Sequence, residues 1–87
     1  MYYVALLKSN EKETPKHIVT AHREYLKDMS EKGKVIMAGK LENANGLIIF
    51  DVDSVEEYER LINLDPFISG NYRKVEALEL NIAVKHF

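Results

Sequence analysis

The sequence predicts an α+β fold in which two helices cover one face of an antiparallel sheet. Two observations support this prediction. Segments with strand composition and segments with helix-start signals follow one another in the order β-α-β-β-α-β. The segment joining the two middle strands, residues 40–45, is short and polar, as in a hairpin connection. The elements are considered in chain order below.

The first strand is predicted over residues 2–8, YYVALLK, a continuous apolar run that the polar stretch SNEKET follows. Aromatic and aliphatic residues without polar alternation are typical of a strand covered on both faces. In so small a domain, one face can meet helices of the same chain. We expect the other face to meet a second subunit.

The first helix is expected to begin with Thr14 as its N-cap and Pro15 at its first position, and to end before Gly33. Apolar residues at steps of three and four define its buried stripe: Ile18, Ala21, Tyr25, Leu26 and Met29. His22 lies four residues after Ile18 and therefore at the border of this stripe.

The second half of the chain supplies two middle strands, a helix and a last strand. The strands are predicted over 34–39 and 46–52, and Ser54 with Glu57 forms a capping box for the next helix. That helix is expected to stop at Asp65-Pro66, because the residue before a proline is pushed out of helical geometry. Alternating apolar residues predict the last strand: Leu78, Leu80, Ile82 and Val84.

This element order is the split βαβ plan of ferredoxin-like folds, with both helices on one sheet face. Apolar residues of the sheet cannot all turn toward two short helices; examples are Val4, Leu6, Ile48 and Phe50. An uncovered apolar sheet face would be a large adhesive patch. We therefore expect a homodimer that packs two sheets face to face.

Length and composition predict a single domain, residues 1–87, in a soluble cytoplasmic protein. The formal charge is −2 with scattered basic residues, which disfavours nucleic acid as a partner. No run approaches the roughly 20 apolar residues of a membrane span. There is no cysteine, which excludes a disulfide framework and a thiol nucleophile.

Common catalytic and metal-binding motifs are absent. The sequence contains no GxGxxG, GxxxxGK[ST], HExxH or GxSxG pattern. His17 and His22 are five residues apart and so do not share a helix face as i, i+4 metal ligands do. We expect neither a metal nor a cofactor.

His22 and Asp65 remain as candidates for chemistry, and their spacing leaves two interpretations open. Both helices lie on one sheet face, so the two side chains could meet, with the carboxylate orienting an imidazole that moves protons. Alternatively, His22 is a half-buried packing residue and Asp65 only a helix stop.

The segments AHREYL, VIMAGKLE, NGLIIFDVDSVEEYERL and DPF together resemble the YciI-like (YCII-related) family over nearly the whole chain. The resemblance implies a dimeric α+β barrel with a small cavity near the sheet. It also implies a catalytic dyad, which falls on His22 and Asp65. The expected substrate is a small aromatic or enol-type molecule that undergoes elimination, isomerisation or hydrolysis. Gly39, Phe67 and Tyr25 are the candidate substrate-binding residues.

Three positions depart from the family's pattern. Lys40 stands where proline usually follows the Ala-Gly turn, Leu47 where serine follows the third-strand glycine, and Val19 where arginine often precedes the histidine. These changes motivate an alternative, a non-catalytic ligand-binding or accessory module on the same fold. A cofactor-independent oxygenase or a muconolactone-isomerase type is a third possibility, because such proteins share the barrel architecture.

Overall fold

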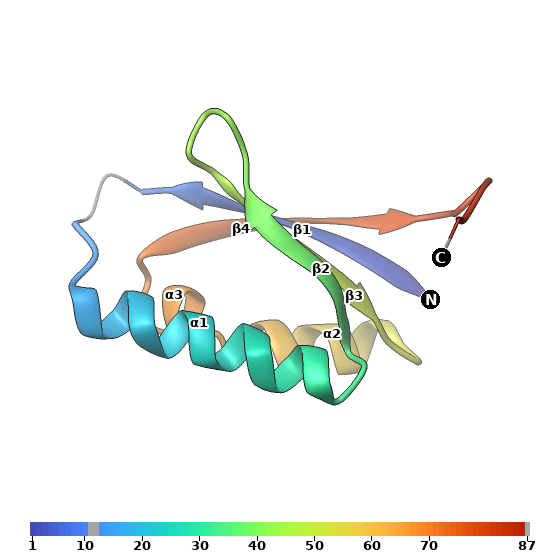
Figure 1. Cartoon of the computed structure of the whole chain (residues 1–87), viewed down its shortest axis with the longest axis horizontal. Helices are drawn as coiled ribbons and strands as arrows, with labels where there is room; N and C mark the ends of the chain where they lie inside the picture. The colour runs from blue at the N-terminus through green and yellow to red at the C-terminus, as the bar shows by residue number, and fades with distance from the viewer. Residues whose placement is uncertain (11–12, 87) are drawn as a thin grey trace.

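The computed structural model describes residues 1–10 and 13–86 (Figure 1). Its elements are β1 (Tyr2–Ser9), α1 (Lys16–Glu31), β2 (Val35–Lys40), β3 (Gly46–Asp51), α2 (Val55–Ile62), α3 (Pro66–Ser69) and β4 (Arg73–Leu80). This confirms the predicted α+β fold and its element order. The short helix α3 is an addition to the predicted plan.

The four strands form one antiparallel sheet in the order β2-β3-β1-β4. All three helices lie on the same side of this sheet, and the opposite side carries no helix (Figure 1). The first strand is central and pairs with both β3 and β4, so the apolar run at the start of the sequence forms the middle of the sheet.

The hydrophobic core lies between the sheet and the helices. Residues directly opposite in an antiparallel pair share a face, so Ala5 with Ile48 and Tyr3 with Phe50 point toward the helices. Tyr58 of α2 packs against this face, stacked on Tyr3 at 4.9 Å and edge-on to Phe50 at 5.4 Å between ring centres. Burial raises the pKa of Tyr58 to about 12.

The sheet face away from the helices carries a row of apolar residues across all four strands. The register aligns the row in the order Met37, Ile49, Val4 and Leu78. Val4 and Leu6 therefore lie on this open face, whereas Ile48 and Phe50 belong to the core. Met37 and Leu78 are about half exposed, at 47% and 51%.

Helix α1 begins one residue later than the sequence predicts, at Lys16. Pro15 takes the N-cap position with φ −60° and ψ 149°, and no side chain caps this end. Thr14 is not the N-cap, because its hydroxyl accepts a hydrogen bond from Arg73 Nη1 at 3.0 Å instead. The other end is as predicted, with Gly33 just beyond the helix at a positive φ of 74°.

The last strand is shorter than the predicted alternation. It ends at Leu80, and residues 81–86 are exposed. Ile82 and Val84 therefore lie outside the sheet, although their spacing continues the strand pattern. This terminal segment returns to β1, where Lys85 Nζ donates to the Tyr2 hydroxyl at 3.0 Å.

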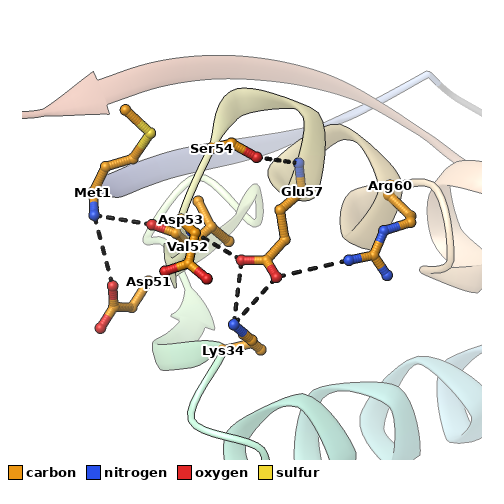
Figure 2. A network of polar contacts seen from close by, with 8 residues as sticks. All are labelled: Met1, Lys34, Asp51, Val52, Asp53, Ser54, Glu57 and Arg60. Carbon is orange, nitrogen blue, oxygen red and sulfur yellow. Dashed lines mark hydrogen bonds and ion pairs between the residues drawn. The ribbon is translucent and has the colours of Figure 1, made fainter.

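Glu57 joins α2 to the sheet through several polar contacts (Figure 2). Its backbone N–H donates to Ser54 Oγ at 3.1 Å, which is the helix-capping bond that the sequence predicts. Its carboxylate accepts from the backbone N–H of Asp53 at 2.9 Å and lies 3.2 Å from Nζ of Lys34, the residue just before β2. Arg60 Nη2 approaches the same carboxylate at 3.7 Å.

In residues 1–10 and 13–86, no helix has both the length and the apolar character that crossing a membrane requires.

Candidate active site

Asp65 lies in the turn between α2 and α3 and begins the second of these helices. The prediction that the second helix runs to Asp65-Pro66 was wrong by a few residues, since α2 ends at Ile62. Asp65 is the N-cap of α3, where its Oδ1 accepts from the Phe67 N–H at 2.9 Å. Pro66 follows at the first helical position, where a missing N–H costs nothing.

The same oxygen of Asp65 contacts His22 of α1. His22 Nδ1 and Asp65 Oδ1 are 2.8 Å apart, and the Asp65 side chain is fully buried while that of His22 is 13% exposed. An ionised carboxylate can only accept a hydrogen bond, so Nδ1 carries the hydrogen. The other ring nitrogen, Nε2, has no protein partner in the described part of the chain.

The His22 ring is also held by stacking on Phe67, at 3.8 Å between ring centres and with the planes 5° apart. The Arg73 guanidinium lies over the same phenylalanine, with Cζ 4.7 Å from the ring centre. Phe67, whose N–H donates to Asp65, therefore contacts both His22 and Arg73 through its ring.

Asp65 Oδ2 is buried and has no hydrogen-bond partner among the described residues. The two donors on Oδ1, from His22 and Phe67, are the groups that offset burial of the carboxylate. A positive charge on the imidazole would lie directly against this anion.

Tyr25 is one turn from His22, but its hydroxyl does not reach the cavity described below. It donates to the backbone carbonyl of Leu61 at 2.6 Å, which links α1 to α2. Burial, and secondarily the charge of Asp65, raise the pKa of Tyr25 well above its ordinary value. Among the described residues, Tyr25 is thus a packing residue with a satisfied hydroxyl.

A cavity of about 320 Å³ lies between α1 and the β2–β3 hairpin, with His22 in its wall. Two of the predicted substrate-binding residues, Gly39 and Phe67, also line it. A Cβ added at Gly39 would meet no atom within 4 Å, as expected for a residue that borders open space. Val19, Lys40 and Leu47, the three departures from the family's pattern, line the cavity as well.

Three basic residues line the same cavity: Arg23 of α1, Lys40 of β2 and Arg73 of β4. None of the described lining residues is acidic, and none of these three cations forms an ion pair within the described part of the chain. Sequence reasoning missed Arg23 and Arg73 as site residues. No local motif marks them, because three separate elements bring the three charges together.

The other histidines lie elsewhere. His17 and His86 are exposed and do not line the cavity. Within residues 1–10 and 13–86, no group of three or more His, Asp or Glu side chains has the arrangement of a metal site.

The structure is thus that of a small antiparallel α+β domain with a buried His–Asp pair beside a cavity. The family model of the YCII-related domain matches residues 1–81, so the chain belongs to the YCII-related family. This confirms the family resemblance seen in the sequence.

One solved structure shares the fold along nearly its full length. It is 5-chloro-2-hydroxyhydroquinone dehydrochlorinase from Burkholderia phenoliruptrix AC1100, in complex with 2,5-dihydroxybenzoquinone. The TM-score is 0.70 with 16% sequence identity, over 93% of this chain and 94% of the other. At this identity, the likeness establishes the fold alone. No curated protein matches the sequence.

Proposed function

We propose that the protein is a small-molecule enzyme in which His22 acts as the general acid and base and Asp65 positions it. The observation that carries the proposal is the 2.8 Å contact between His22 Nδ1 and the buried Asp65 carboxylate, at the wall of a cavity. The reaction class is proton transfer in an elimination, isomerisation or hydrolysis.

The proposed chemistry uses the two ring nitrogens differently. Nδ1 donates to Asp65, which fixes the tautomer and leaves the Nε2 lone pair to accept a proton from the substrate. Proton acceptance makes the imidazole positive, and the adjacent carboxylate stabilises that charge. Nε2 then returns the proton to the departing or rearranged group. The scheme needs no cofactor.

The family and the fold support a small organic substrate. The structural neighbour is named as a dehydrochlorinase of a hydroxylated ring and was solved with a dihydroxybenzoquinone. The cavity of this chain, about 320 Å³, lies at the lower end of the range for small-molecule sites. We propose that the substrate of this protein is a molecule of similar size that is aromatic or carries an enol.

Proton transfer can be assayed before the natural substrate is identified. We would incubate the protein in D₂O with hydroxyquinols, including 5-chloro-2-hydroxyhydroquinone, and small enolisable acids, and follow deuterium incorporation and product formation by mass spectrometry. For a compound that the wild type converts, His22→Gln is expected to lower the rate about 100-fold or more, the usual contribution of a general acid or base. Asp65→Asn should also lower the rate, because the amide oxygen can still accept the hydrogen bond from His22 but carries no charge to stabilise the positive imidazole.

His17→Gln is the matched control, since it makes the same substitution at an exposed position of α1. It should retain the wild-type rate. Wild-type rates in His22→Gln, or no conversion of any compound by the wild type, would contradict the proposal.

A second candidate is the non-catalytic binding module. The observation that favours it is that Val19, Lys40 and Leu47 all line the cavity, so the departures from the family's pattern change the ligand's surroundings. A ligand that binds wild type and His22→Gln equally well and is converted by neither would identify this function.

A further inference from the structure

The charged side chains that line the cavity, among the described residues, are all basic. Arg23, Lys40 and Arg73 line it, and none of them has a carboxylate partner among the described residues. The nearest acid of the site, Asp65, is buried behind His22 and already accepts two hydrogen bonds.

Arg73 is the cation that the fold holds in place. Its Nη1 donates to Thr14 Oγ1 at 3.0 Å and to the Tyr72 carbonyl at 2.8 Å, and its Cζ lies over the Phe67 ring. Both hydrogens of Nη1 are therefore used. Nε and Nη2 form the other edge of the guanidinium, and this edge has no acceptor among the described residues.

Two parallel N–H groups on one guanidinium edge match the two oxygens of a carboxylate. The His22 ring and Arg73 both contact the Phe67 ring, with the His22 ring centre 3.8 Å and Arg73 Cζ 4.7 Å from its centre, and both line the cavity, so a carboxylate bound by Arg73 would share the cavity with the imidazole. Lys40 and Arg23, both exposed, add positive charge at the cavity wall.

We propose that the ligand of this cavity is a small carboxylate, held by the Nε–Nη2 edge of Arg73 in the cavity that His22 also lines. The inference rests on the proposed function, because it assigns a substrate class to the same site. It adds a residue with a stated role: Arg73 binds the anionic group while His22 transfers the proton. Lys40 and Arg23 attract the anion without fixing its orientation.

Binding of benzoate and benzamide, which have nearly the same shape but differ in charge, tests the proposal. We would titrate each into ¹⁵N-labelled protein and follow the backbone amide resonances. Benzoate is expected to shift amides around the cavity, such as those of Gly39 and Phe67, and to bind at least tenfold more tightly than benzamide. Arg73→Gln should weaken benzoate binding about tenfold or more, the loss typical of a hydrogen-bonded charge pair, and leave benzamide unchanged.

Lys74→Gln is the matched control, because Lys74 is an exposed neighbouring cation that does not line the cavity. It should bind benzoate as the wild type does. If loss of the Thr14 contact unfolds Arg73→Gln, the exposed Lys40→Gln takes its place, with an expected loss of two- to fivefold and a reduced dependence on salt.

Equal affinity for the two probes, no benzoate binding, or unchanged affinity in a folded Arg73→Gln would overturn the carboxylate site; if Arg73→Gln does not fold, unchanged affinity in Lys40→Gln would do so. His22→Gln separates this result from the proposed function. It should retain benzoate binding within about threefold while losing proton transfer. Persistent proton transfer in His22→Gln would refute the catalytic role and leave the binding result standing.

Discussion

At the residue scale, one carboxylate oxygen serves both the fold and the proposed chemistry. Asp65 Oδ1 caps α3 through the Phe67 N–H and receives the His22 N–H. Phe67, which the cap positions, stacks on His22. The imidazole is thus held by a hydrogen bond and by a ring contact, and both depend on the same turn. Such double restraint is what a preorganised site requires.

This arrangement predicts the tautomer of His22. In ¹H–¹⁵N correlation spectra of the neutral ring, the hydrogen should be found on Nδ1, because Asp65 offers only an acceptor there. Asp65→Ala removes that acceptor, and the ring should then shift toward the Nε2–H tautomer that is ordinary in solution. His17, which is exposed, provides the internal reference. A wild-type ring protonated on Nε2 would contradict the geometry.

The sequence predicted which residues form the pair but not the full composition of the site. Topology allows His22 to meet Asp65, since two helices lie on one sheet face, and the family resemblance assigned the pair to these two residues. Arg73 could not be found in this way. Its position depends on the Thr14 hydroxyl and the Phe67 ring, contacts between segments far apart in the sequence. Tyr25 was predicted to bind substrate but does not line the cavity, because its hydroxyl donates to the Leu61 carbonyl.

At the element scale, Glu57 connects the start of α2 to Lys34, in the turn that precedes β2 (Figure 2). Its pKa is lowered from 4.5, chiefly by the hydrogen bond from the Asp53 backbone N–H and further by Lys34 and Arg60. A carboxylate whose pKa is lower in the folded state than in the unfolded state stabilises the protein at pH values above its unfolded-state pKa. That stabilisation is lost as the pH falls through the folded-state pKa.

We therefore expect Glu57→Gln to be less stable than the wild type at pH 7, with the difference shrinking as the pH falls below about 4.5. Urea denaturation at a series of pH values measures it. Glu59→Gln is the control, because Glu59 lies on the same helix, is exposed and forms no ion pair among the described residues. A Glu57→Gln difference that does not change with pH would refute the electrostatic explanation.

Local signals explain which element boundaries the sequence predicted. Ser54 and Glu57 define the start of α2 because the capping bond lies within one turn. The start of α1 was misplaced because Thr14 bonds to Arg73, a distant residue. Helix α3 has only four residues, too few to show a helical period, so Asp65 looked like the end of a helix.

At the scale of the whole molecule, the sheet has one face covered by helices and one open face. The open face carries the apolar row of Met37, Ile49, Val4 and Leu78. An apolar surface of this extent is typical of an interaction site in a soluble protein. We propose that it packs against the same face of a second copy, the sheet-to-sheet homodimer expected from the sequence.

Leu78→Glu should shift the protein from dimer to monomer in light scattering coupled to size-exclusion chromatography. It places a charge at the β4 end of the apolar row, opposite Val4, where burial in the proposed interface without a partner is costly. Leu64→Glu is the control, because Leu64 is 58% exposed and lies in the turn after α2, outside the sheet. A wild-type monomer, or a Leu78→Glu dimer of unchanged stability, would rule out this interface.

The cavity wall and the proposed acid–base pair come from different parts of the chain. His22 and Asp65 belong to α1 and to the turn before α3, whereas Gly39, Lys40 and Leu47 belong to the β2–β3 hairpin. At the tip of the hairpin, the Leu41 N–H donates to the Asn45 carbonyl and the Ala44 N–H donates to the Leu41 carbonyl. The hairpin is therefore a local unit that could be replaced by the hairpin of a relative. Grafting the hairpin of a relative is expected to change what the pocket accepts while the proposed acid–base pair stays in place.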